Sequence, residues 1–292
     1  MIVSIVISFY NSQENCAELL EELGTIMTSN VKYQFELLIV DDGSFLFDLT
    51  IFKRFKIPAN SCFKIIQLNK NYGQITAILT GLHYAKGEVV VIMSSDLQDP
   101  PELINDMLQI HAQTNCEMVA CVRNKRKDSI IRKLGAYIWY RIVVLAINPS
   151  YPKKGGDYAL INRRLVNSLL ENKSTIRFLQ NELLQFSKST QYIEYERKQR
   201  FNKKSEWKIF KIVQLVLDIL FTHTNVIQFF VYYNLISILV IILSLKNMVA
   251  TIITLTGIII VNLLFVGEFY RIRRKKRESF SIEDINKIIY QS

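Results

Sequence analysis

The stretch Glu88-Val-Val-Val-Ile-Met-Ser-Ser-Asp-Leu-Gln-Asp-Pro-Pro101 contains a strand, a polar loop and the start of a helix. Its first part, residues 88–93, is almost wholly hydrophobic, as expected for a central parallel strand with both faces covered. The apolar run stops at Ser94, and the two prolines are typical of the first turn of a helix. The stretch therefore predicts a parallel sheet whose central strand ends in a loop carrying Asp96 and Asp99.

Further strands and helices are expected on both sides of this stretch. The hydrophobic pattern predicts helices at residues 14–28 and 74–85, and strands at residues 2–8, 35–40, 62–68 and 119–122. Strands that alternate with helices predict an α/β domain with a parallel sheet covered on both faces. Ligands of such sheets bind beyond the carboxyl ends of the strands, where this chain carries Asp41, Asp42, Asp96 and Asp99.

Two long apolar segments follow the α/β region. Residues 226–245 and 249–267 are 20 and 19 residues long and contain no charged residue. Since about 20 apolar residues suffice for a helix to cross a bilayer, we predict a transmembrane hairpin. Two buried helices of a soluble core are the alternative. Basic residues flank both outer ends, so the positive-inside rule predicts that both termini and the α/β domain are cytosolic.

The patterns together predict four parts. Residues 1–204 form the cytosolic α/β domain, residues 205–225 an amphipathic helix in the membrane interface, residues 226–267 the hairpin, and residues 268–292 a basic cytosolic tail. For residues 205–225, the alternative is an ordinary helix whose apolar face packs on the core.

The formal net charge of +10 is concentrated in three basic runs, residues 123–133, 197–211 and 271–277. Such runs bind nucleic acid, anionic lipid heads or phosphates, or simply form a solvated face. Two of them lie next to apolar segments of membrane length, which favours the membrane and its lipid phosphates over nucleic acid. The four cysteines have no metal-binding spacing and indicate reduced, cytosolic thiols.

The acidic loops have a structural and a functional interpretation. Asp41 and Asp42 before Gly43 fit a simple turn, and Asp99 before Pro100 fits a helix N-cap. Taken together, the two loops place carboxylates at adjacent strand ends. That arrangement suits a divalent cation bound to a diphosphate.

Four motifs occur in order along the chain: Val40-Asp-Asp-Gly-Ser44, Asn69-Lys-Asn-Tyr-Gly73, Ser95-Asp-Leu-Gln-Asp-Pro-Pro-Glu102 and Gly156-Asp-Tyr158. With the paired apolar segments and the basic tail, they resemble the family 2 glycosyltransferases over nearly the whole chain. The subgroup that the chain resembles is the polyprenyl-phosphate glycosyltransferases, related to dolichol-phosphate mannose synthase and bactoprenol glucosyltransferases. The resemblance implies a GT-A-like nucleotide-sugar-binding α/β domain, an interfacial helix and two transmembrane helices.

The resemblance assigns residues to the donor side of a site. Asp41 or Asp42 is expected to contact the nucleotide base and ribose, and Ser94 and Asp96 to lie at the donor. Relatives hold a metal with an Asp-x-Asp-x-Gln run, in which this chain has serine at the first position. Asp96 and Gln98 are therefore the expected ligands of Mg²⁺ or Mn²⁺. Mg²⁺ usually takes only one or two protein carboxylates besides phosphate and water.

The resemblance also assigns residues to the acceptor side. Asp157 matches a carboxylate that relatives place near the acceptor, so Asp157 and Asp96 are the catalytic candidates. A phosphate monoester is largely ionised at neutral pH, so Asp157 is interpreted as orienting groups as readily as acting as a base. Arg123, Arg132 and Arg200 are expected to bind the acceptor phosphate with two hydrogen bonds each; surface ion pairs are the alternative.

The activity implied is that of a metal-dependent, inverting glycosyltransferase. It would move a sugar from a nucleotide-sugar of the UDP type to polyprenyl phosphate, as a multi-pass protein of the bacterial cytoplasmic membrane in cell-envelope polysaccharide synthesis. A homo-oligomer is compatible with the sequence. Two alternatives remain open: a degenerate, non-catalytic protein with the transferase fold, and a transferase acting on a lipid-linked saccharide or a polysaccharide.

Overall fold

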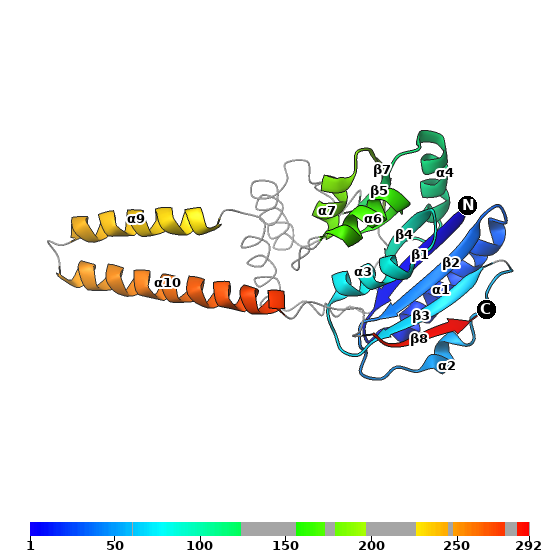
Figure 1. Ribbon diagram of the computed structural model, residues 1–292, viewed down its shortest axis with the longest axis horizontal. Coiled ribbons are helices and arrows are strands. Elements are labelled where there is room, and N and C mark those ends of the chain that lie inside the picture. Colours follow the sequence, from blue (N-terminus) through cyan, green and yellow to red (C-terminus); the bar gives the residue numbers. More distant parts are fainter. Residues whose placement is uncertain are drawn as a thin grey trace. The chain divides into compact units, whose positions relative to one another are not determined.

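A computed structural model describes residues 1–59, 61–123, 156–172, 179–196, 226–244, 248–277 and 285–291. These residues belong to two compact units. One is an α/β unit that contains the described residues up to 196 together with 285–291, and the other is a pair of helices within residues 226–277 (Figure 1). The predicted interfacial helix at residues 205–225 lies outside the described residues.

The elements of the α/β unit follow the order β1 (Ile2–Phe9), α1 (Gln13–Ser29), β2 (Gln34–Asp41), α2 (Leu49–Phe52), β3 (Cys62–Leu68), α3 (Gln74–Tyr84), β4 (Val89–Ser94), α4 (Leu103–Thr114), β5 (Met118–Arg123), β6 (Tyr158–Asn162), α6 (Arg163–Glu171), α7 (Leu179–Phe186), β7 (Thr190–Tyr195) and β8 (Ile285–Gln291). Each predicted strand and helix is confirmed within one or two residues at its ends.

The strands form one sheet in the order β7-β5-β6-β4-β1-β2-β3-β8. The segment from β4 to β3 is parallel throughout, as the sequence predicted. The predicted parallel sheet is confirmed in part, because β6 runs antiparallel between β4 and β5, and β8 runs antiparallel beside β3. The antiparallel course of β6 places its first residue beside the last residues of β4 and β5, so three strand ends meet at one edge.

Helices cover both faces of the sheet, and each face has its own core. Along β1, Ile5 and Ile7 pack with α1, α2 and α4, whereas Val6 packs with α3, α6 and α7. Every residue from Val3 to Phe9 is buried, which is why this strand is apolar without alternation. In α1 the buried residues recur at helical spacing and form one stripe: Cys16, Leu19, Leu20, Leu23, Ile26 and Met27.

The helical unit consists of α9 (Val226–Ser244) and α10 (Met248–Arg277), which lie side by side (Figure 1). The rings of Phe230 and Phe265 stack between them with centroids 3.7 Å apart. Within the described residues, one segment is long and apolar enough to cross a membrane, Thr251–Arg271, with a mean hydropathy of 2.2. The apolar part of α9, Tyr232–Ile242, is shorter. The second crossing therefore stays a prediction.

The end of the chain differs from a simple tail. Helix α10 continues through the basic run to Arg277, and residues 285–291 form β8 at the edge of the sheet. Strand β8 pairs with β3 over most of its length, with Ile65 opposite Ile289. One sheet therefore contains strands that precede the apolar region in the sequence and a strand, β8, that follows it.

Candidate active site

The acidic pair at the end of β2 is buried, and its carboxylates accept hydrogen bonds from the protein. Oδ1 of Asp41 accepts from the backbone amide of Ser44 at 3.0 Å and from its hydroxyl at 2.5 Å. Oδ2 of Asp41 accepts from the side-chain amide of Gln67 on β3 at 3.1 Å. Asp41 therefore fixes the loop after β2 against the neighbouring strand.

Asp42 joins the loop after β3 to this corner. Its two carboxylate oxygens accept from the backbone amides of Tyr72 at 2.8 Å and Gly73 at 2.9 Å. Burial raises the pKa of Asp42 to about 6, although the two amides favour the ionised form and the nearby charge of Asp41 disfavours it. Gly73 is the N-cap of α3, so Asp42 also fixes the start of that helix.

Gly43 permits the close approach of these two loops. It has φ of 69°, and a Cβ atom there would lie 2.3 Å from the carbonyl carbon of Lys70. Only glycine fits such a contact with backbone. The glycine of the first motif is therefore explained by packing at the corner where Asp41 and Asp42 lie.

The loop after β4 carries the expected metal ligands. The backbone amide of Gln98 donates to Oδ1 of Asp96 at 3.2 Å, and Leu97 between them has φ of 58°. A left-handed conformation is uncommon for leucine, and here the Leu97 side chain packs against the core cluster on the α1 face. The strain is thus offset by packing, and the loop holds the partly exposed Asp96 and Gln98 beyond the end of β4.

Asp99 binds a side chain on a distant strand and does not cap helix α4. Helix α4 begins at Leu103 with Glu102 as its N-cap residue, so the interpretation of Asp99 as the N-cap was wrong. The Asp99 side chain is buried and accepts a hydrogen bond of 2.5 Å from the hydroxyl of Tyr195, at the end of β7. The hydroxyl of Tyr158 donates to the carbonyl oxygen of Pro100 at 3.1 Å.

Arg123 and Asp157 come together across the ends of β5 and β6. Nη2 of Arg123 lies 3.4 Å from Oδ2 of Asp157, and the side-chain amide of Gln180 on α7 donates to Oδ1 of the same carboxylate. Burial opposes the charge of Arg123, but the neighbouring Asp157 and Tyr195 outweigh it and raise the pKa of the guanidinium. The side chain of Asp157 remains 45% exposed, so a ligand can reach it.

The structure therefore brings most of the predicted residues to one edge of the sheet, at the carboxyl ends of β2, β4 and β5: Asp41, Asp42, Ser94, Asp96, Gln98, Arg123 and Asp157. Arg132 and Arg200 lie outside the described residues. Sequence reasoning missed Gln67, Gln180 and Tyr195. The partners of these three side chains lie 23 to 96 positions away in the chain, and no local motif surrounds them.

No group of three or more His, Cys, Asp or Glu side chains in the described part of the chain is arranged to hold a metal ion. Asp96 and Gln98 supply one carboxylate and one amide oxygen on a single loop. Hard oxygen ligands of this number fit Mg²⁺, which keeps several waters and binds phosphate oxygens as well. The donor set thus fits a metal that the substrate would help to hold.

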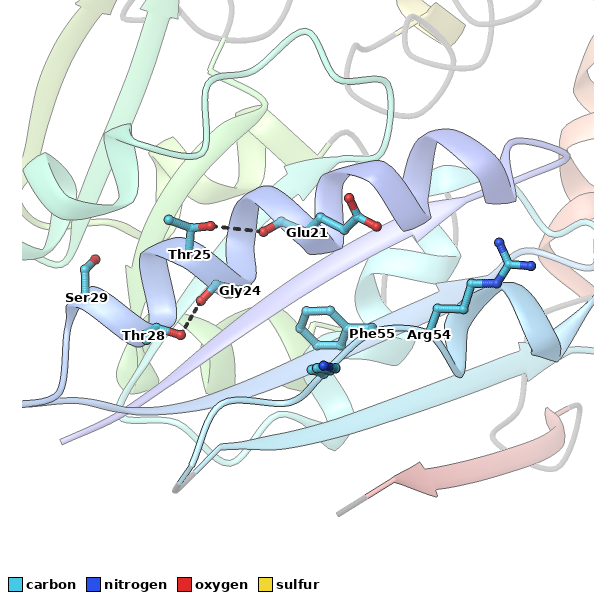
Figure 2. Close-up of a pocket in the computed structure, with 8 residues that line it drawn as sticks. Glu21, Gly24, Thr25, Thr28, Ser29, Arg54 and Phe55 are labelled. Carbon is cyan, nitrogen blue, oxygen red and sulfur yellow. Dashed lines mark hydrogen bonds between the residues drawn. The ribbon is translucent and has the colours of Figure 1, made fainter.

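A separate surface groove lies along α1, lined by Glu21, Gly24, Thr25, Thr28, Ser29, Arg54, Phe55 and Lys56 (Figure 2). None of the residues predicted for the site lines it. The groove is open, and the hydroxyls of Thr25 and Thr28 in its lining donate to backbone carbonyl oxygens of α1 itself. The strand ends, with their carboxylates and Arg123, remain the candidate active site.

Comparison with known proteins identifies the family of the chain. A sequence profile of the family described as Glycosyl transferase family 2 matches residues 4–170. The undecaprenyl-phosphate 4-deoxy-4-formamido-L-arabinose transferase of Pseudomonas fluorescens is 31% identical over 75% of this chain and 63% of its own length. CsbB of Bacillus subtilis, a protein classed with the glycosyltransferases, is 26% identical over 98% of this chain and 92% of its own length.

Two crystal structures share the fold. Glucosyl-3-phosphoglycerate synthase from Mycobacterium tuberculosis matches with a TM-score of 0.53 at 14% identity, over 76% of this chain and 80% of the other. Residues 1–349 of Staphylococcus aureus TarS, solved with UDP-GlcNAc, match with a TM-score of 0.51 at 17% identity, over 75% and 65%. The α/β unit therefore has the GT-A-like architecture of these transferases.

Proposed function

Because the chain belongs to glycosyl transferase family 2, we propose that it transfers a sugar from a UDP-sugar to the phosphate of a polyprenyl phosphate, with inversion at the anomeric carbon. The reaction takes place at the cytosolic face of the bacterial cytoplasmic membrane. The observation that carries the proposal is the meeting of two chemically different groups at one sheet edge. Asp96 and Gln98 suit a metal-bound diphosphate, and Arg123 beside Asp157 suits a phosphate monoester.

The donor binds on the β2 and β4 side. Asp41 and Asp42 hold the loops that frame the nucleotide, and Asp96 and Gln98 hold Mg²⁺ or Mn²⁺. A metal held there would supply positive charge to stabilise the leaving nucleoside diphosphate. Ser94 contributes a neutral hydroxyl at the position where relatives have a carboxylate.

The acceptor phosphate binds on the β5 side, at Arg123 with Arg132 and Arg200. Its oxygen attacks the anomeric carbon, the bond to the diphosphate breaks, and the nucleoside diphosphate leaves. A phosphate monoester has its second pKa near 6 and is already mostly deprotonated at neutral pH. Both oxygens of Asp157 accept hydrogen bonds from side chains, which suits an orienting role better than that of a general base.

The membrane arrangement extends the proposal. Residues 1–204 form the cytosolic transferase domain, residues 205–225 lie in the interface, residues 226–267 cross the membrane twice, and residues 268–292 return to the cytosol. The pairing of β8 with β3 supports an even number of crossings, because the chain before α9 and the chain after α10 contribute strands to the same sheet.

Mass analysis of the lipid product tests this function. The full chain, purified in nanodiscs with undecaprenyl phosphate, is given a panel of UDP- and GDP-sugars with and without Mg²⁺. The proposal expects an undecaprenyl-phosphate monosaccharide from one UDP-sugar and little product in excess chelator. A protein that binds donor but yields no glycosylated product would be the degenerate form, and product only with a lipid-linked saccharide would identify a different acceptor.

A further inference from the structure

Tyr195 joins the two halves of the candidate site. It lies at the end of β7, its side chain is buried, and its hydroxyl donates a hydrogen bond of 2.5 Å to Oδ1 of Asp99. Arg123 lies directly opposite Tyr195 in the pairing of β5 with β7, and the charge of its guanidinium acts on the tyrosine hydroxyl. A tyrosine hydroxyl has one proton to donate, so this arrangement fixes its direction.

Asp99 belongs to the donor-side loop. It lies three positions after Asp96, and it has only 2% of its surface exposed. Tyr158 holds the next residue of this loop through the carbonyl of Pro100, and the rings of Tyr158 and Tyr195 meet edge to face with centroids 6.4 Å apart. Two tyrosines, from the strands β6 and β7 on either side of β5, thus hold the loop that presents Asp96 and Gln98.

Arg123 continues the series toward the acceptor side. Arg123 is the register partner of Tyr195 on the neighbouring strand, its guanidinium lies 3.4 Å from Oδ2 of Asp157, and Gln180 donates to Asp157 in turn. Five polar side chains therefore lie in series from the donor loop to the acceptor-side carboxylate, with strand pairing placing Tyr195 beside Arg123: Asp99, Tyr195, Arg123, Asp157 and Gln180.

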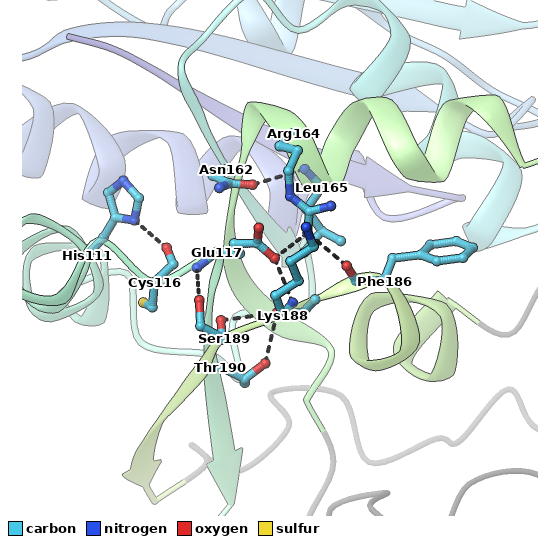
Figure 3. Close-up of polar contacts among 11 residues, drawn as sticks. His111, Cys116, Glu117, Asn162, Arg164, Leu165, Phe186, Lys188, Ser189 and Thr190 are labelled. Atoms are coloured by element: carbon cyan, nitrogen blue, oxygen red, sulfur yellow. Dashed lines mark hydrogen bonds and ion pairs between the residues drawn. The ribbon is translucent and has the colours of Figure 1, made fainter.

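Strand β7 is anchored firmly at its other end. The backbone amide of Lys188 donates to the Glu117 carboxylate at 2.6 Å, and the amide of Glu117 donates to the carbonyl of Ser189 at 3.1 Å. Arg164 binds Glu117 and the carbonyl of Phe186, so this cluster fixes the start of β7 against β5 and α6 (Figure 3). Tyr195 is consequently presented from a strand held at both ends.

We infer that Tyr195 is a positioning residue for sugar transfer, whose hydroxyl holds Arg123 in register with the donor loop through Asp99. The inference rests on the proposed function, since it takes Arg123 as a ligand of the acceptor phosphate. Without the hydroxyl, Asp99 loses this donor and Arg123 loses the polar neighbour that links its position to the loop. Small misplacements of reacting groups cost about 100-fold in rate even when both substrates still bind.

The test is Tyr195→Phe, which removes one oxygen atom and keeps the ring. Expected is a fall in kcat of about 10- to 100-fold, a several-fold rise in KM for undecaprenyl phosphate, and a KM for the UDP-sugar within about twofold of wild type. Tyr192→Phe is the matched control, because Tyr192 lies on the same strand with 47% of its surface exposed. It should behave as wild type. A Tyr195→Phe variant that lost stability but kept wild-type kcat and KM would overturn the inference.

Two further measurements complete the test. Asp99→Asn keeps an acceptor for the Tyr195 hydroxyl, so it should lower kcat less than Tyr195→Phe, and the double variant should be no slower than Tyr195→Phe alone. Additive losses would refute the coupling, and so would failure of both single variants to fold while Tyr192→Phe folds. If wild type neither transfers sugar nor binds citronellyl phosphate in a direct titration, the proposed function has failed instead.

Discussion

Oδ2 of Asp42 accepts a hydrogen bond of 2.9 Å from the backbone amide of Gly73, the residue at which α3 begins. The other oxygen of this carboxylate accepts from the amide of Tyr72 at 2.8 Å. A side chain at the end of one strand therefore caps a helix that follows the next strand. This contact defines the corner on which the nucleotide is proposed to lie, and it makes the stability of the corner dependent on pH.

Stability should decrease as Asp42 ionises. Burial raises its pKa to about 6, above the ordinary value of 3.8, so the folded state binds the proton more tightly than the unfolded state. The contribution to stability is then present below about pH 4 and is lost as the pH rises through about 6. We expect the difference in free energy of unfolding between wild type and Asp42→Asn to be larger at pH 4.5 than at pH 7.5.

The comparison with Asp42→Asn cancels the titration of other groups, such as Glu36. Burial alone would raise the pKa of Glu36, but hydrogen bonds from Lys64 and other donors lower it. Thermal unfolding of both proteins at each pH measures the difference. Asp42→Asn should itself be less stable by about 1–3 kcal/mol, because its amide nitrogen must face a backbone N–H. A difference that stays constant from pH 4.5 to 7.5 would contradict the assignment.

Gly43→Ala should be much more damaging than Gly73→Ala. Both glycines have positive φ, 69° and 95°, but a Cβ atom at Gly43 would lie 2.3 Å from backbone, whereas one at Gly73 would meet nothing within 4 Å. Gly73→Ala should cost about 1–3 kcal/mol of conformational strain. Gly43→Ala adds displacement of the loop after β3, so a larger loss of stability and of donor binding is expected, measured by chemical unfolding and by titration with UDP-sugar. Equal losses would show that backbone strain alone matters at this corner.

Asp96→Ala should abolish transfer and leave the fold intact. Its carboxylate is partly exposed beyond β4 and accepts from the amide of Gln98, so its removal affects the loop tip rather than the core. The companion variant Ser94→Asp adds a carboxylate at the position where the family resemblance implies one, and unchanged or tighter Mn²⁺ affinity is expected. Circular dichroism checks the fold, and titration with Mn²⁺ in the presence of UDP checks binding. Full activity of Asp96→Ala, or of wild type in excess chelator, would remove the metal from the proposal.

Arg123→Ala should weaken use of the acceptor and spare the donor. Loss of charge-assisted hydrogen bonds worth about 1.5–3 kcal/mol predicts a drop of about 10- to 100-fold at low acceptor concentration. Arg123→Lys should recover only part, because a point charge lacks the two-pronged geometry. Arg54→Ala is the matched control, since Arg54 lines the separate groove along α1. Kinetics against undecaprenyl phosphate and UDP-sugar affinity without acceptor are measured together. Loss of UDP-sugar binding with normal acceptor dependence would assign Arg123 to the donor diphosphate.

The parts of the fold that could be predicted from the sequence are those in which local chemistry decides. The central strands are continuous apolar runs because both faces are buried, and their ends are marked by Asp, Gly and Ser. For residues 156–158, only the resemblance to a family motif predicts a position near the site. The antiparallel insertion of β6 follows from tertiary packing, which a local pattern does not contain.

The missed features share a physical cause, which is dependence on distant partners. Tyr195 receives its role from Asp99, 96 positions away, and Asp99 looked like a helix cap because its immediate neighbours are prolines. Residues 285–291 looked like part of a charged tail, but the exposed edge of β3, more than 200 positions earlier, offers backbone partners that any extended segment can use. The sequence therefore predicts the carboxylates of the site but not the side chains that donate hydrogen bonds to them.

The apolar region should cross the membrane twice. Strand β8, after α10, and the strands before α9 belong to one sheet, so the chain must return to the side from which it left. A single crossing by Thr251–Arg271 alone would put β8 and β3 on opposite sides and forbid their pairing. A reporter fused after Gln291 should therefore be cytosolic, and one inserted at Asn247 should be external. Two cytosolic reporters would mean that α9 and α10 lie on the membrane without crossing it. An external reporter after Gln291 would mean that β8 does not pair with β3 in the membrane-bound protein, and the cytosolic location of the site would lose its main support.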